Sequence, residues 1–176
     1  MVDKDSQEFA FRVAIDAGDI EGARKLLSER PDLPMRLSAE RVWLLKDAAK
    51  ESSPEMIRWL VQEVGEDLAK QDANDYTALN FAVLFGKLEN ARALLELGAD
   101  ADLGYPLFSV LSRHVEDPVA MATLLISYGA DVNQLVIEEG MPPRNILTEA
   151  EDCENEEMIE FLRSQGAKLP VELMES

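Results

Sequence analysis

The chain has 176 residues and is 47% hydrophobic, which is enough for one domain with a sizeable core. Its 35 Asp and Glu residues outnumber its 17 Lys and Arg residues, and the formal net charge of −18 argues against binding to nucleic-acid phosphates or to an anionic membrane surface. The single cysteine, Cys153, excludes an internal disulfide, and because there is neither an N-terminal signal segment nor an apolar run long enough to span a membrane, we expect a cytosolic protein.

Pairs of large apolar residues recur along the chain at steps of 34, 34, 30 and 37 residues, and each pair is predicted to lie on the second helix of a two-helix unit. These pairs are Leu26-Leu27, Leu60-Val61, Leu94-Leu95, Leu124-Leu125 and Phe161-Leu162. The pattern predicts a single domain over residues 1–176, with units at about 6–33, 39–67, 72–100, 105–133 and 143–168 and a tail at 169–176.

The first two units are predicted from helical spacing and from helix-start signals. Phe11 and Ile15 recur with the spacing of a core-facing helix. The segment PDLPMRLSAE at residues 31–40 contains two prolines and is predicted to be a connector rather than a helix. In the second unit, the sequence SPE at residues 53–55 supplies a capping serine, a proline and an acidic residue, so a helix is predicted to begin there.

The third unit, residues 72–100, has the clearest helical pattern. Thr77 is a good N-cap, and the residues after it place apolar side chains on one face of a helix that Gly86 ends. The pair Leu94-Leu95 marks the second helix. Gly98 stands where a residue in the left-handed conformation commonly closes a helix.

This third unit resembles the ankyrin repeat. The family's T-P-L-H-x-A signature stands as TALNFA at residues 77–82, with Ala and Asn in place of Pro and His, and its closing glycine stands in GAD at residues 98–100. The fourth unit begins with YPL at residues 105–107, which predicts an inner α-helix continuing through Val110 and Leu111, and it ends on the family's GADVN. Few residues separate these two units, so the finger between them should be truncated.

The resemblance implies an all-α ankyrin-repeat solenoid of about five helix pairs with short or irregular hairpin fingers. Proteins of this family usually bind protein partners on the concave face formed by the fingers and inner helices. Ankyrin-like spacing exposes Leu84 and Phe85 on this face, and it places Asn74 and Tyr76 beside them at a fingertip. Exposed aliphatic and aromatic residues of this kind form binding hot spots. The open alternative is that Leu84 and Phe85 only pack against a neighbouring unit whose finger is short.

Further partner-binding residues are predicted in the later units. Ser112 and Arg113 occupy the corresponding positions of the fourth unit. The fifth unit carries an acidic segment at residues 149–160 with seven carboxylates and no base. Its predicted binding residues are Glu149, Glu151, Asp152, Glu154 and Glu156. The alternative is that this charge run is a solvated face that only keeps the protein soluble.

No catalytic, cofactor-binding or metal-ligating residue is predicted, and we expect a protein without enzyme activity. His114 is the only histidine and falls in a turn, while the carboxylates around Cys153 disfavour a reactive thiolate. The acidic segment lacks the ligand spacing and the glycine of a calcium-binding loop. An enzyme built on carboxylates, with or without a metal, is the alternative class of function.

The predicted partner is a basic protein. Small acidic cytosolic proteins of this kind resemble bacterial immunity proteins, some of which are ankyrin-like, and the resemblance implies a role in neutralising a toxin. Nucleases are basic because they must hold phosphate, and a chain with a charge of −18 would be steered onto such a surface. A regulatory or scaffolding adaptor is the alternative, and in either case we expect the free chain to be a monomer.

Overall fold

Short helices follow one another with few residues between them. The computed structural model describes residues 4–39, 43–137 and 139–175. In chain order the elements are α1 (Lys4–Asp16), α2 (Ile20–Glu29), α3 (Leu33–Ala39), α4 (Leu44–Glu51), α5 (Pro54–Trp59), the π-helix η1 (Leu60–Val64), α6 (Ala78–Leu84), α7 (Leu88–Glu96), the 3-10 helix η2 (Pro106–Leu111), α8 (Pro118–Ser127), α9 (Ile146–Asp152), α10 (Glu156–Ser164) and α11 (Pro170–Met174). Within the described residues, extended pairing is limited to one antiparallel bridge between Val136 and Arg144.

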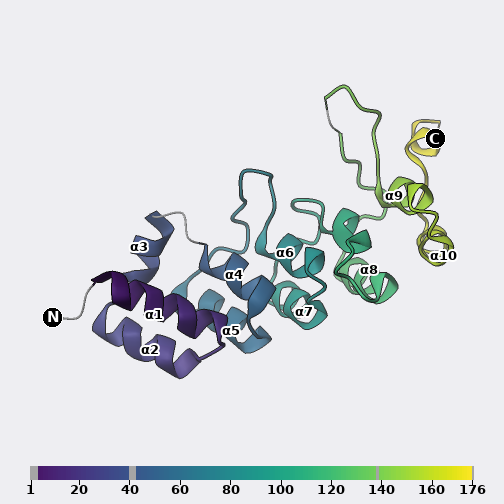
Figure 1. Cartoon of the computed structure of the whole chain (residues 1–176). Helices are drawn as coiled ribbons and strands as arrows, with labels where there is room; N and C mark the ends of the chain where they lie inside the picture. Colours follow the sequence, from purple (N-terminus) through teal and green to yellow (C-terminus); the bar gives the residue numbers. More distant parts are fainter. Residues whose placement is uncertain (1–3, 40–42, 138, 176) are drawn as a thin grey trace.

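The helices stack side by side in two rows. The inner row runs α1, α4, α6, η2 and α9, and each of these helices contacts the next. The outer row contains α2, α5, α7, α8 and α10, and each outer helix packs on the inner helix that precedes it in sequence. Figure 1 shows the pairs as an elongated array with loops that rise from one side. This arrangement confirms the predicted all-α solenoid of helix pairs.

Side-chain caps explain where several of these helices begin. At the start of α5, the backbone N–H of Met56 donates to the Ser53 hydroxyl at 3.3 Å, and at the start of α8 the N–H of Ala120 donates to the Asp117 carboxylate at 2.8 Å. In both helices a proline follows the cap. The backbone N–H at this first position makes no hydrogen bond within a helix, so a proline there costs none. The predicted start of the helix at residues 53–55 is therefore confirmed.

The core lies between the two rows of helices. Leu94 and Leu95 of α7 are buried there, with exposures of 0% and 4%, as their spacing predicts. Phe11 and Ile15 of α1 are also buried. The pair Leu26-Leu27 is only half-buried, because α2 lies at the end of the array and has a neighbouring helix pair on one side alone.

The prediction of a connector at residues 31–40 is wrong for the part that the structure describes. Residues Leu33–Ala39 form α3, and Glu40 lies outside the described residues. Pro34 falls in the first turn of this helix, where a proline is tolerated. Leu33 and Leu37, one helical turn apart, are both buried, so apolar burial outweighs the breaker signal of the prolines.

Two further expectations differ from the structure. The inner helix of the fourth unit is the 3-10 helix η2 rather than an α-helix, and Tyr105 before it has a left-handed backbone with φ of 61°. The tail predicted at residues 169–176 contains α11, in which Pro170 begins a helix and is buried. The Glu172 carboxylate accepts from Arg163 of α10 at 2.7 Å and from the Leu169 N–H, which holds this last turn on the array.

Loops connect each outer helix to the next inner helix, and three of them differ in length. We name residues 65–77 the first long finger, residues 98–105 the short finger and residues 128–145 the second long finger. Backbone hydrogen bonds of 2.8 and 3.0 Å across the Val136–Arg144 bridge close the second long finger. No helix in the described part of the chain combines the length and the apolar character needed to cross a membrane.

Candidate functional site

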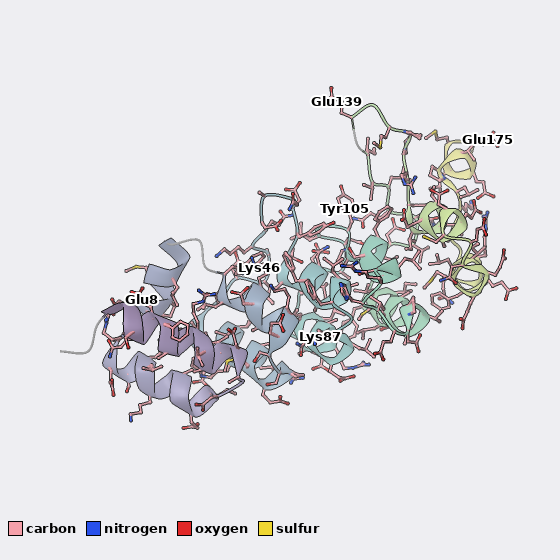
Figure 2. All side chains as sticks on the ribbon, in the orientation of Figure 1. Glu8, Lys46, Lys87, Tyr105, Glu139 and Glu175 are labelled. Atoms are coloured by element: carbon pink, nitrogen blue, oxygen red, sulfur yellow. The ribbon has the colours of Figure 1, made fainter. Side chains whose placement is uncertain are left out.

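A groove opens between the two long fingers, over the short finger. It encloses about 530 Å³ and is lined by Asn74, Asp75, Tyr76, Tyr105, Phe108, Ser109, Val136 and Ile137. We call it the inter-finger groove. Tyr105 is 38% exposed and Ile137 is 72% exposed, so apolar surface faces solvent here. Figure 2 shows Tyr105 on the side from which the loops rise and Lys87 on the opposite side of the array.

Hydrogen bonds within the first long finger fix the two predicted residues that line the groove. The Asp72 carboxylate accepts from the backbone N–H of Asn74 at 2.8 Å and from that of Tyr76 at 3.1 Å. The Asp72 N–H donates to the Tyr76 carbonyl at 2.9 Å and closes the loop. Asn74 is exposed and Tyr76 is half-buried, and both line the inter-finger groove.

A second pocket continues the groove towards the C-terminal helices. It encloses about 200 Å³, shares Phe108 and Val136 with the inter-finger groove, and reaches Arg144 and Glu149. Met141, which also lines it, is 59% exposed. The groove and this pocket together expose aromatic and aliphatic side chains from both long fingers and from η2.

Three lysines lie over three aromatic rings between the groove and the N-terminal helices. Lys70 of the first long finger lies 5.5 Å from the Trp43 ring centroid. Lys46 and Lys50 of α4 lie 5.4 and 5.5 Å from the ring centroids of Phe81 on α6 and of Phe85, the residue that follows α6. We call these six residues the lysine–aromatic row. It adjoins the groove, because Tyr76 packs edge-to-face on Phe81 at 6.1 Å and Phe81 in turn packs edge-to-face on Trp43 at 6.2 Å.

The predicted anchors Leu84 and Phe85 are half-buried rather than fully exposed. The Phe85 ring stacks on the His114 ring, with centroids 5.6 Å apart and planes inclined by 4°. The Ser112 hydroxyl donates to the Leu84 carbonyl at 2.9 Å. Packing against the fourth unit therefore takes up part of this surface. Arg113 is exposed beside it, and its Nε donates to His114 Nε2 at 3.3 Å.

The predicted acidic binding residues separate into two groups. Arg144 Nη2 lies 2.7 Å from both Glu149 and Asp152, and Arg163 lies 3.6 Å from Glu151, so arginines from outside the segment pair with these three carboxylates and offset part of their charge. Hydrogen bonding to Glu149 and Asp152 raises the pKa of the Arg144 guanidinium. Glu154 and Glu156 lie exposed in and after the turn that follows α9, and within the described residues no ion pair involves either of them.

Sequence reasoning missed Lys46, Lys70 and most of the groove. Lys46 and Lys50 are four residues apart on α4, and Phe81 of α6 and Phe85, its C-cap residue, have the same spacing, so the members of each pair lie one helical turn apart. This matched spacing was the available signal. The exposed groove residues Tyr105 and Ile137 gave no such signal, because the groove depends on the different lengths of the fingers.

The chemical groups of the inter-finger groove and the lysine–aromatic row suit binding better than catalysis. Within the described residues, no cluster of three or more His, Cys, Asp or Glu side chains is arranged to hold a metal ion. Cys153 is exposed at the end of α9, far along the chain from His114. What the surface offers is aromatic rings, aliphatic side chains and ammonium groups, which are the usual components of protein interfaces.

Comparison with known proteins decides the family. The sequence profile described as ankyrin repeats, in three copies, matches residues 11–105, which is more than half of the chain. The chain belongs to the ankyrin-repeat family. Ankyrin repeats are protein–protein interaction modules, typically without enzyme activity of their own, and this family membership points to a protein as the partner.

Two curated proteins are similar to this ankyrin chain. The E3 ubiquitin-protein ligase Ufd4 of Drosophila melanogaster is 28% identical over 158 residues, which cover 90% of the chain but 6% of that protein. The phosphocholine transferase AnkX of Legionella pneumophila is 25% identical over 134 residues, which cover 70% of the chain and 14% of that protein. The chain therefore spans only a small part of the length of either relative.

Proposed function

We propose that the inter-finger groove is the main surface on which this ankyrin chain docks a protein partner. The observation that carries the proposal is the exposed apolar lining of a groove of about 530 Å³, with Tyr105 and Ile137 at its edges. Aromatic residues exposed together in a depression are typical anchors of protein interfaces. Asn74 and Tyr76 belong to this surface from the first long finger.

The proposed surface extends from the groove onto the inner helices. Leu84 and Phe85 present the parts of their side chains that the fourth unit leaves uncovered, and Arg113 stands exposed at their side. Ser112 fixes this edge through its hydrogen bond to the Leu84 carbonyl. In this proposal Arg113 lies at the polar rim and the groove supplies the desolvated centre, which is the usual division of an interface.

The proposed partner is a basic protein, and the proposed role is neutralisation of a toxin. The net charge of −18 supports this proposal, because it would steer a basic protein towards the chain. Glu154 and Glu156, which have no ion pair within the described residues, are the predicted binding residues best placed to attract it. The proposal places the chain in the cytosol, as a monomer when free.

Site-specific crosslinking tests the docking surface. The variant Tyr105→benzoylphenylalanine places a photo-crosslinker in the groove, and Tyr128→benzoylphenylalanine places the same group at the end of α8, where the side chain is 44% exposed. After irradiation in the source cells, mass spectrometry should identify a protein crosslinked at position 105 and not at position 128. Identical crosslinks at both positions would contradict the groove as the docking surface.

Co-expression of the recovered partner separates the proposed roles. If the partner is a toxin, it should arrest growth when expressed alone, and the wild-type chain should restore growth. The double variant Tyr105→Ala and Phe108→Ala should fail to restore growth while keeping the helical circular dichroism of the wild type. A recovered partner without toxicity would reject the neutralising role and leave docking in the groove intact.

A regulatory or scaffolding adaptor is the second candidate function. The relatives favour it, because the segment similar to this chain forms 6% of a protein named as a ubiquitin ligase and 14% of a protein named as a phosphocholine transferase. In such large proteins an ankyrin segment is suited to recognition alongside other parts. For this chain, an adaptor role predicts that the crosslinked partner is harmless by itself and remains active when bound.

A further inference from the structure

The lysine–aromatic row is a local exception in an acidic chain. The whole sequence has 17 cationic residues against 35 carboxylates. Yet three lysines gather over adjacent rings, with ammonium nitrogens 5.4 to 5.5 Å from the centroids. The row combines positive charge with apolar surface. The negative net charge of the chain does not predict such a positive region.

These lysines differ from the arginines of the array in what they contact. Arg24, Arg58 and Arg144 each lie 2.6 to 2.8 Å from a carboxylate oxygen of the chain. Among the described residues, by contrast, no carboxylate lies within ion-pair distance of Lys46 or Lys70. A ring face is a poor hydrogen-bond acceptor. The N–H groups of these ammonium groups therefore stay available to donate hydrogen bonds to a partner.

Carboxylates lie close to the row, and they reduce the positive electrostatic potential around its lysines. Asp47 Oδ1 is 3.7 Å from the Lys50 Nζ, which makes this the weakest of the three lysines for an external partner. Glu66 is half-buried beside Lys70, and its burial raises its pKa and so disfavours its charged form. Asp16 and Glu51 stand at the N-terminal end of this face. Lys46 and Lys70 are consequently the principal anion-attracting groups.

From this contrast we propose that the lysine–aromatic row binds an acidic, extended segment of the protein partner. The proposal rests on the proposed function, because the segment crosses α4 and α6 with one end in the inter-finger groove. Its carboxylates meet Lys46 and Lys70, and its aromatic or aliphatic residues pack on Phe81 and Tyr76.

The spacing of the row fits such a segment. Residues four apart on a helix are about 6 Å apart along its axis. Carboxylates on alternate residues of an extended chain are separated by about 6.5 to 7 Å. Alternate acidic residues can therefore reach Lys46 and Lys50 together, and apolar residues nearer the groove end of the segment pack on Phe81 and Tyr76. A partner with an overall positive charge can carry this segment, because electrostatic complementarity at interfaces is local and fixes orientation.

Synthetic peptides test the inference on the full chain. The probes are fluorescently labelled peptides of about twelve residues, long enough to cross a groove in extended form. One alternates Tyr with Glu, one alternates Tyr with Lys and one alternates Tyr with Gln. Fluorescence anisotropy at low salt measures their affinity. We expect the Tyr–Glu peptide to bind at least about tenfold more tightly than the other two, because it alone satisfies the ammonium groups.

Charge-matched variants show whether the row is responsible. The triple variant Lys46→Gln, Lys50→Gln and Lys70→Gln should weaken binding of the Tyr–Glu peptide about tenfold. The control variant Lys25→Gln, Lys87→Gln and Lys168→Gln changes the net charge equally at exposed lysines outside the row and should change affinity less than about twofold. Replacing the three row lysines by arginine should preserve binding, because charge and ring contacts are kept.

Several results would overturn the inference. It fails if the Tyr–Glu peptide does not bind, if the Tyr–Lys peptide binds as tightly, or if both triple Gln variants lose affinity equally. Tighter binding of a thymidine oligonucleotide than of the Tyr–Glu peptide would also reject a protein segment as the ligand. A Tyr–Gln peptide that binds as tightly as the Tyr–Glu peptide, and depends on Tyr105 and Phe108 only, would reject this inference while leaving docking in the groove intact.

Discussion

Two buried asparagines join neighbouring units of the array. Asn80 of α6 accepts from the Thr77 N–H at 2.8 Å and donates to the Gly104 carbonyl at 2.5 Å, which ties the base of the first long finger to the short finger. It stands where the ankyrin signature has histidine. Asn90 of α7 donates to carbonyls at the end of α4, in the preceding unit. Each amide thus satisfies backbone groups that would otherwise be buried without partners.

Replacing Asn90 by alanine should destabilise the chain by about 1 to 3 kcal/mol, the usual penalty for leaving buried polar groups unsatisfied. The carbonyls of Ala49 and Ser52 lie 3.1 and 3.0 Å from the Asn90 amide nitrogen and would lose this donor. Urea unfolding followed by circular dichroism measures the change. The exposed Asn74→Ala control should shift the free energy of unfolding by less than about 0.5 kcal/mol. Equal stability of both variants would show that the amide of Asn90 is dispensable.

Glu66 should make stability depend on pH. Burial raises the pKa of Glu66 above its ordinary value of 4.5, and this outweighs the lowering by Lys70 and by a hydrogen bond from the Leu45 backbone. A raised folded pKa means that the folded state holds the proton more tightly. The stabilisation from this group is therefore complete below the ordinary pKa, and it is lost as pH rises through the folded pKa.

The variant Glu66→Gln removes this titration. Its melting temperature should exceed that of the wild type at about pH 7, and the difference should shrink as pH falls below about 4.5, where the wild-type carboxyl is protonated as well. Thermal melts of both proteins across this range provide the measurement. Glu29→Gln, at an exposed position of α2, controls for the loss of one negative charge from an acidic chain. A constant difference at all pH values would be inconsistent with burial of an ionised Glu66.

At the scale of helices, local signals predicted most starts and failed where packing decided the outcome. Ser53 and Thr77 cap their helices as their sequence contexts indicate. The helix α3 was missed, because its prolines read as breakers while the burial of Leu33 and Leu37 is visible only in three dimensions. The division into five units at about 6–33, 39–67, 72–100, 105–133 and 143–168 stays a prediction.

The candidate site follows the same division between local and long-range information. Tyr76 was predicted because it lies at a fixed offset from the Thr77 cap. Lys46 and Lys70 were not predicted, because each contacts a ring that is distant in the sequence. A local sequence pattern carries no information on such contacts. The ion pairs that Arg144 and Arg163 form with the acidic segment were hidden for the same reason.

Gly86, between α6 and α7, provides a test of how the third and fourth units fit together. Its φ is +66°, and a Cβ placed there would lie 2.1 Å from the His114 carbonyl oxygen. Gly98 also has a positive φ, of +96°, but a Cβ there would meet nothing within 4 Å. The two glycines thus share a backbone requirement and differ in the space around them.

The variant Gly86→Ala should therefore be more destabilised than Gly98→Ala. Both should lose about 1 to 2 kcal/mol from the left-handed conformation, and Gly86→Ala should lose about 1 to 3 kcal/mol more because the turn that holds His114 must move. Urea unfolding of the two variants gives the difference. In Gly86→Ala the His114 ring resonances should also shift in NMR spectra, since the Phe85 stack moves with them. Equal destabilisation would mean that the turn adapts without cost.

Across the whole molecule, two regions differ in the charges that they present. Lysines over aromatic rings occupy the middle of the finger side, whereas the C-terminal pair α9 and α10 carries carboxylates. Arg144 and Arg163 pair with Glu149, Glu151 and Asp152, whereas the other four carboxylates of the segment, Glu154, Glu156, Glu157 and Glu160, have no ion pair within the described residues. Charge reversal at Glu149, Glu151 or Asp152 would break an ion pair of the fold and change the electrostatic field at the same time.

Neutralising only the four unpaired carboxylates gives a clean test of steering. If the partner is basic, the variant with Glu154, Glu156, Glu157 and Glu160 changed to Gln should associate with the crosslinked partner about tenfold more slowly at low salt, because these charges attract the partner before contact. The difference should vanish at about 1 M salt, where the screening length falls to about 3 Å, and the dissociation rate should stay close to that of the wild type.

A control with the same net charge separates local steering from total charge. It carries Gln at Glu29, Glu55 and Glu116 and Asn at Asp100, which are exposed and lie outside the lysine–aromatic row and the C-terminal pair. Stopped-flow measurements on both variants should show slower association only for the C-terminal one, since exposed charges act mainly within a screening length of about 10 Å. Equal slowing would assign steering to the net charge of −18 as a whole. Unchanged rates in both variants would exclude electrostatic attraction of a basic partner, and the acidic segment would then only keep the protein soluble.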